Sequence, residues 1–202
     1  MAMKRFPLER YATLELNQVA FPKTGMVVSQ TPLGEAFTKE APCENGMWVV
    51  ADKAAGAINP VTAATDKPVG IVYTAEKEYD YEHYGLKNFG RKIKGDYPRV
   101  GIFGIGDTVT SNCLQYDDSV FQAVTTSGSE KTSAEVLDAY LSALDDTNKA
   151  YVVISAKNGA KVGVPEIVKT LPVNYAGIYG RIVKYYTVPN GEKGVKYQII
   201  SL

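Results

Sequence analysis

The sequence predicts a mainly β protein: a short-stranded barrel or sandwich with an extended N-terminal arm, one amphipathic helix and a C-terminal antiparallel sheet. Three observations support this fold class. Short runs rich in Val, Ile and Tyr recur along the 202 residues between Gly, Pro and Asp turns. Only one window, at about residues 132–145, places apolar residues at helical spacing. Hydrophobic residues make up 45% and charged residues 22%, a globular composition with enough apolar surface for a core.

Residues 1–44 are predicted to form the extended arm. Four prolines interrupt it: Pro7, Pro22, Pro32 and Pro42. Because no apolar periodicity persists between them, the arm has too little apolar surface to fold alone, and we expect it to lie on another surface. The first residues lack the apolar core of a signal peptide, and no apolar run in the chain is long enough to span a membrane. We therefore expect a soluble protein made in a reducing cytosol that does not bind membranes.

Residues 45–126 are predicted to form a β-barrel or sandwich domain. Its expected strands are 47–51, 68–74, 98–105, 108–110 and 119–125, with a weaker one at 57–61 that proline stops. They are short, close together and separated by turn residues, which favours a barrel or sandwich over parallel strands joined by helices.

Residues 127–202 are predicted to form a helix followed by a C-terminal β subdomain. Thr132 and Glu135 have the spacing of a capping box. An apolar stripe follows at helical intervals: Val136, Leu137, Tyr140, Leu141 and Leu144. The expected strands are 151–155, 161–164, 178–188 and 195–202, with hairpin turns at the Asn-Gly pairs 158–159 and 190–191.

Residues suited to catalysis or metal binding are few. His83 is the only histidine, and the residues around it do not form the glycine pattern of a nucleophile elbow. Cys43 and Cys113 lack a zinc-ligand spacing, and we expect them to be free thiols. The glycines at 101, 104 and 106 precede a predicted strand, so no helix N-terminus follows them to hold a phosphate. We expect no enzymatic activity, no cofactor and no metal.

A polar, tyrosine-rich stretch at about residues 76–94 is the predicted contact surface. The chain has 14 tyrosines, a residue type suited to interfaces because it combines an apolar ring with a polar tip. The candidate interface residues are Tyr79, Tyr81, His83, Tyr84, Arg91 and Lys92. An alternative is a carbohydrate- or ligand-binding β module that uses Tyr79, Tyr81 and Tyr84 for stacking. With 22 basic and 22 acidic residues, the chain has no net positive charge, so we expect no general nucleic-acid binding.

Four segments resemble head decoration (cement) proteins and related virion components of tailed bacteriophages. They are residues 45–54, 66–73, 97–101 and 106–110, so the resemblance covers about residues 45–110. It implies a small β-barrel or sandwich on the outside of the capsid, which forms a homo-oligomer and bridges neighbouring capsomers. The implied partners are the major capsid protein and copies of the chain itself. The implied location is the virion, after synthesis in the host bacterial cytoplasm. A tail or baseplate component is the alternative. The resemblance implies no active-site residues.

Overall fold

The computed structural model describes residues 2–7, 12, 14, 27–28, 31–51, 53–74, 93–126, 129–187 and 191–202. One α-helix is described, α1 (Ser133–Ser142), together with a short 3-10 helix at Lys53–Ala55. The strands are β1 (Met3–Arg5), β2 (Val27–Val28), β3 (Trp48–Val50), β4 (Asn59–Pro60), β5 (Val69–Val72), β6 (Val100–Ile102), β7 (Thr108–Ser111), β8 (Gln115–Asp117), β9 (Val124–Thr126), β10 (Ser129–Lys131), β11 (Tyr151–Val153), β12 (Glu166–Val168), β13 (Tyr179–Thr187) and β14 (Lys193–Ser201). The predicted mainly β fold is confirmed.

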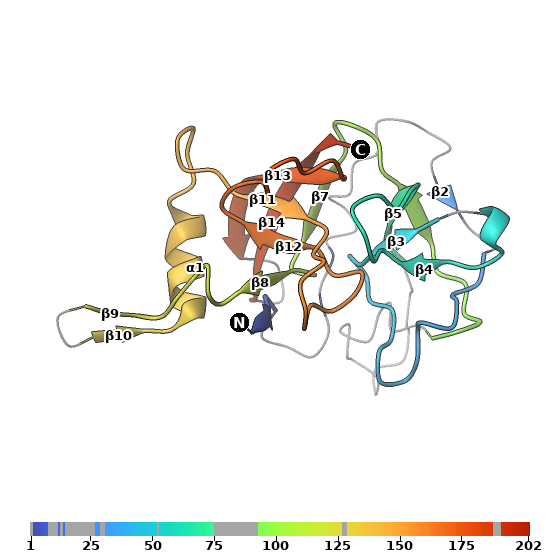
Figure 1. Cartoon of the computed structure of the whole chain (residues 1–202), viewed down its shortest axis with the longest axis horizontal. Coiled ribbons are helices and arrows are strands. Elements are labelled where there is room, and N and C mark those ends of the chain that lie inside the picture. Colours follow the sequence, from blue (N-terminus) through green and yellow to red (C-terminus); the bar gives the residue numbers. More distant parts are fainter. Residues whose placement is uncertain are drawn as a thin grey trace.

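Two sheets form the body of the molecule, and they are arranged like a sandwich without closing into a barrel (Figure 1). The five-stranded sheet is antiparallel, with the order β2-β6-β5-β3-β4. The seven-stranded sheet has the order β1-β8-β12-β11-β13-β14-β7, and its only parallel pair is that of β12 with β8. Its two longest strands, β13 and β14, form the predicted C-terminal antiparallel hairpin.

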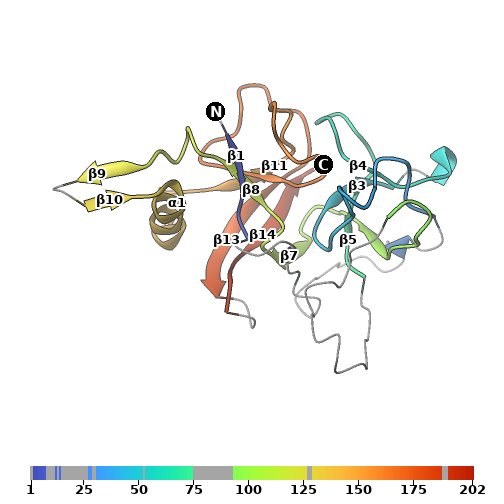
Figure 2. The same cartoon turned by 90° about the horizontal axis from the view of Figure 1, so that it is seen from below.

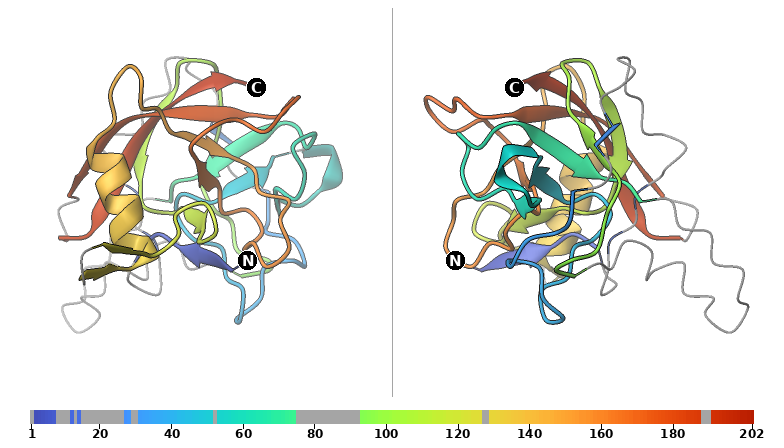
Figure 3. Two further views of the ribbon diagram at one scale, coloured as in Figure 1. Left: turned by 60° about the vertical axis from the view of Figure 1, so that its left-hand side comes forward. Right: turned by 90° about the vertical axis from the view of Figure 1, so that its right-hand side faces the viewer.

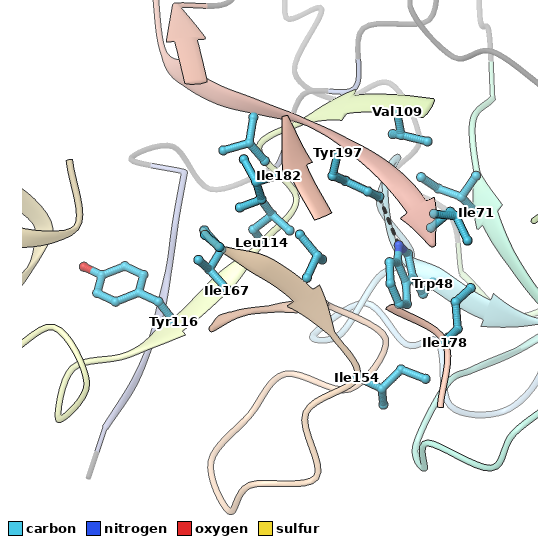
Figure 4. Close-up of a cluster of buried hydrophobic side chains, with 14 of the residues drawn as sticks. Trp48, Ile71, Val109, Leu114, Tyr116, Ile154, Ile167, Ile178, Ile182 and Tyr197 are labelled. Carbon is cyan, nitrogen blue, oxygen red and sulfur yellow. Dashed lines mark hydrogen bonds between the residues drawn. The ribbon is translucent and has the colours of Figure 1, made fainter. Parts of the chain in front are cut away.

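The main core joins the two sheets (Figure 4). Trp48 and Ile71 of the five-stranded sheet pack in one cluster with Ile182 and Tyr197 of the seven-stranded sheet. The indole Nε1 of Trp48 donates a hydrogen bond to the hydroxyl of Tyr197 at 3.1 Å. A second, smaller cluster contains Val49 and Val72 of the five-stranded sheet, together with Phe37 and both cysteines.

Helix α1 begins where the capping box places it. The Glu135 carboxylate accepts a hydrogen bond from the backbone N–H of Thr132 at 2.7 Å, and the Thr132 hydroxyl accepts one from the N–H of Glu135 at 3.3 Å. Leu137 and Leu141 are buried in the main core, which confirms the predicted apolar stripe. Beyond the helix, the Asn148 side chain donates to the backbone carbonyl of Ala143 at 2.9 Å, and the chain turns toward β11.

The described parts of the N-terminal arm lie on the body of the same chain. Strand β1 pairs with β8 at the edge of the seven-stranded sheet, and β2 pairs with β6. Arg5 forms a double hydrogen bond with the carboxylate of Glu44, at 3.3 and 3.0 Å. Glu44 is 1% exposed; it also accepts a hydrogen bond from the N–H of Ala12 at 2.9 Å and pairs with Lys161. One buried carboxylate thus connects the arm to the body.

Sheet membership does not follow the predicted boundary at residue 126. β7 and β8, expected in the middle domain, belong to the sheet that contains the C-terminal strands. The main core is likewise continuous across this boundary, since Trp48 and Tyr197 are both part of it. The two regions therefore share one core.

Two strand predictions are wrong. A tight hairpin was expected at residues 158–159, but residues 161–164 form no strand, and β11 pairs with β12 and β13. The intervening loop instead bonds to the five-stranded sheet: the N–H of Trp48 donates to the carbonyl of Gly163 at 2.7 Å. Gly163 has φ +75, and a Cβ there would lie 2.9 Å from Pro60, so this close approach requires glycine.

The expected strand at residues 119–125 is replaced by a turn and the separate hairpin of β9 and β10. Asp117 causes the turn, because its carboxylate accepts hydrogen bonds from the N–H and the hydroxyl of Ser119, at 2.9 and 2.7 Å. The β9–β10 hairpin extends away from both sheets, next to α1 (Figure 2).

Candidate interaction surface on the C-terminal sheet

The hairpin of β13 and β14 buries one face, and no helix in the described part of the chain covers the other. Ile182, Val195 and Tyr197 point into the main core, on the side where the leucines of α1 pack. Figure 3 (left) shows the two strands crossing the molecule with α1 on one side of them only. Because alternate strand residues point to opposite faces, Arg181 and Lys196 lie on the other side. We call this side the outer face and define it by Tyr151, Tyr175, Tyr179, Arg181, Lys184 and Lys196.

A β-bulge places Lys184 on the outer face. Ile182 pairs with Tyr197, and Lys184 pairs with Lys196, so the register shifts by one residue between them. Without the bulge, Lys184 would point into the core like Ile182, because the side-chain period of a strand is two. The extra residue, Val183, is 51% exposed. The bulge therefore adds both a cation and an exposed apolar side chain to this face.

Three half-buried tyrosines form a continuous row on the outer face. The rings of Tyr151 and Tyr179 lie 6.2 Å apart with an interplanar angle of 76°, and those of Tyr175 and Tyr179 lie 6.5 Å apart at 71°. Both are edge-to-face contacts, which aromatic rings favour. The Tyr175 hydroxyl accepts from the N–H of Ile154 and donates to the carbonyl of Ile178, each at 3.0 Å. Burial raises the pKa of Tyr175. The two hydrogen bonds of its hydroxyl hold the ring in place.

The cations of the outer face are poorly neutralised. Lys184 and Lys196 lie opposite each other in the strand register, and no carboxylate within the described residues pairs with either. Arg181 has one distant partner, Asp146, at 3.8 Å, and that carboxylate is fully exposed. Like charges directly opposite in a sheet are destabilising. The positive charge of this face therefore does not stabilise the free protein.

An apolar groove of about 690 Å³ adjoins the tyrosine row. Val153 and Val168 line it from the sheet, and the turn that contains Pro172 and Val173 lines its side. Val173 is 91% exposed, although it is apolar. Tyr175 belongs to both regions, because it lines the groove and contacts Tyr179. The groove and the outer face thus form one continuous surface.

An ion cluster contributes Lys157 and Glu166 to the lining of the groove. The ammonium of Lys157 contacts the carboxylates of Asp117 at 2.8 Å and Glu166 at 2.6 Å, and both acids are 2% exposed. Burial acts to raise the pKa of Asp117, but hydrogen bonds from Lys157 and Ser119 outweigh it and lower that pKa to about 2. A carboxylate so firmly ionised is a structural ion-pair partner and a poor proton donor at neutral pH.

Neither cysteine has the environment of a reactive thiol. Cys43 and Cys113 form no disulfide and are fully buried, at 0% and 1% exposure. Burial raises the pKa of Cys113 to about 12, so the thiolate is scarce at neutral pH. Across the described ranges, no group of three or more His, Cys, Asp or Glu side chains is placed to hold a metal ion. The one α-helix described is too short and polar to cross a membrane.

The predicted interface residues Tyr79, Tyr81, His83, Tyr84, Arg91 and Lys92 lie outside the described residues. The outer face was not predicted. The strand that contains Tyr179 and Arg181 could be recognised, but the bulge at Val183 breaks the alternation that would assign Lys184 to a face. The high tyrosine content was the one signal in the sequence that pointed toward a surface of this kind.

Comparisons with protein-family models, with curated proteins and with solved structures find no match for this chain. We therefore infer its function from the surfaces that the described residues form.

Proposed function

We propose that this chain is a virion structural protein of a tailed bacteriophage: a decoration (cement) protein that binds the capsid lattice and stabilises it through protein–protein contacts. Its partners would be the major capsid protein and further copies of itself, and its location would be the virion.

The observation that carries this proposal is the outer face. Tyrosine and arginine are the residue types most enriched at the centres of protein interfaces. Here Tyr151, Tyr175, Tyr179 and Arg181 lie together on a rigid strand framework beside an apolar groove. Such a surface suits contact with another folded protein, where buried area provides the binding free energy.

The remaining features agree with a contact function. Lys157 and Glu166 of the groove are engaged in a structural ion cluster with Asp117, and the thiols are buried. The mainly β, sandwich-like body agrees with the fold that the sequence resemblance implies. A net charge of zero removes long-range repulsion between copies, which favours a dense array on a lattice.

Co-sedimentation tests the proposal. Capsid shells of the source phage, assembled without this chain, are mixed with increasing amounts of the purified protein and pelleted. We expect saturable binding at a fixed number of copies per shell and a higher melting temperature of the decorated shells. A protein that stays in the supernatant at every concentration would contradict the proposal. Stacked six-fold rings of the protein alone would instead favour the tail alternative.

A further inference from the structure

We propose that the outer face docks onto an acidic protein surface, whose carboxylates lie against Arg181, Lys184 and Lys196. This inference rests on the proposed function and specifies the chemistry of the partner. The tyrosine row and the groove would supply the apolar part of the same contact.

The hairpin places two like charges, those of Lys184 and Lys196, opposite each other. Lys184 and Lys196 repel each other across the hairpin, and no carboxylate of the described chain relieves this repulsion. A partner carboxylate placed between the two ammonium groups would convert the repulsion into two attractions. Binding therefore gains from a charge arrangement that is unfavourable in the free protein.

The β-bulge of β13 determines on which face these cations lie. Lys184 and Lys196 lie on the same face because the bulge at Val183 turns Lys184 outward. Arg181 lies on the same side, toward Tyr179 along the strand. Among the described carboxylates, its guanidinium pairs only with the exposed Asp146, at 3.8 Å. Asp146 is a fully exposed carboxylate, so a partner carboxylate can replace it at little cost. The three cations thus form a row beside the tyrosines.

The residues around Arg181, Lys184 and Lys196 favour a protein partner over a nucleic acid. An exposed valine, Val183, lies among the cations, and an apolar groove lined by Val153 and Val168 continues the face. Apolar side chains and a groove of this kind match a folded protein surface. A phosphate backbone would leave them without a partner.

The test uses the double variant Lys184→Glu/Lys196→Glu and a matched control, Lys39→Glu/Lys131→Glu. Both change the net charge by the same amount, and the control lysines are exposed and lie off the outer face. Each protein is titrated against fluorescent poly-L-glutamate, against an oligothymidylate of equal charge, and against the undecorated shells. Circular dichroism and melting curves establish that each variant is folded.

We expect the outer-face variant to lose at least tenfold in affinity for poly-L-glutamate and for shells, while the control stays within twofold of the wild type. The salt dependence of binding should also weaken in the outer-face variant only. Equal losses in both variants would overturn the inference, as would tighter binding of oligothymidylate than of poly-L-glutamate. If the wild type binds poly-L-glutamate through the outer face but does not bind shells, the proposed function fails and the acidic docking face stands.

Discussion

Lys184 and Lys196 lie directly opposite each other in the hairpin of β13 and β14, and no carboxylate within the described residues pairs with either. Opposite charges at such a position stabilise a sheet, and like charges destabilise it. A sequence optimised for the stability of the isolated chain would avoid this pair. Its presence is explained if the outer face serves a contact.

The first prediction follows from this pair. Lys196→Glu should raise the free energy of unfolding by about 0.5 kcal/mol, because it replaces a cross-strand repulsion with an attraction. For a chain of this size, the melting temperature should rise by about 1–2 °C. Thermal unfolding in low salt measures the change, with Lys39→Glu as the control at an exposed, distant lysine. A stability equal to that of the control would show that the two ammonium groups do not interact.

The second prediction concerns the hydrogen bond between the sheets. Tyr197→Phe should lower the free energy of unfolding by about 1–3 kcal/mol, because it leaves the buried indole N–H of Trp48 without its acceptor. Chemical denaturation measures the loss. Tyr116→Phe is the matched control: Tyr116 is also buried, but its hydroxyl has no hydrogen bond within the described residues. Equal losses in both variants would mean that the bond contributes no net stability.

The third prediction concerns the carboxylate that connects the arm to the body. Burial acts to raise the pKa of Glu44, but Arg5 and Lys161 outweigh it and lower that pKa, so the group is ionised in the folded protein. Glu44→Gln should cost about 3 kcal/mol in stability, because two partly buried cations lose their shared partner.

The same change should speed tryptic cleavage after Arg5, since the double hydrogen bond to Glu44 is lost. The control is Glu40→Gln, at an exposed carboxylate, which should leave both stability and cleavage unchanged. If Glu44→Gln and Glu40→Gln are cleaved at equal rates, Glu44 does not hold the arm.

The fourth prediction is a loss of stability in acid. The pKa of Asp117 is lowered from 3.8 to about 2, so the unfolded chain binds the proton more readily than the folded one. The contribution of Asp117 to stability is therefore complete above pH 4 and disappears as the pH falls toward 2. Melting temperatures recorded from pH 6 to pH 2 should decline less steeply over this range in Asp117→Asn. Parallel profiles for the two proteins would contradict this assignment.

Local patterns in the sequence predicted much of the fold. The capping box at Thr132 and the long strands on either side of Gly191 were confirmed because short-range chemistry decides them. The parallel pairing of β12 with β8 could not be predicted, since it joins residues about 50 positions apart. The turn at Ser119 and the loop at Gly163 were misassigned because a single carboxylate and a contact with another sheet determine them.

The candidate surface was harder to predict than the fold. Tyr175 and Tyr179 are close in sequence, but Tyr151 joins them only when β11 and β13 pair. The bulge that turns Lys184 outward leaves no signature in the residue types around it. An interaction face of this kind depends on register, which a single sequence does not specify.

A cryo-electron microscopy reconstruction of capsid shells decorated with the wild-type protein is the most direct test of the central claim. We expect density for the β body on the outside of the lattice, with Tyr179, Arg181 and Lys184 at the contact and acidic side chains of the capsid protein facing them. A reconstruction in which the outer face points into solvent, or in which the protein is found only in the tail, would contradict the claim.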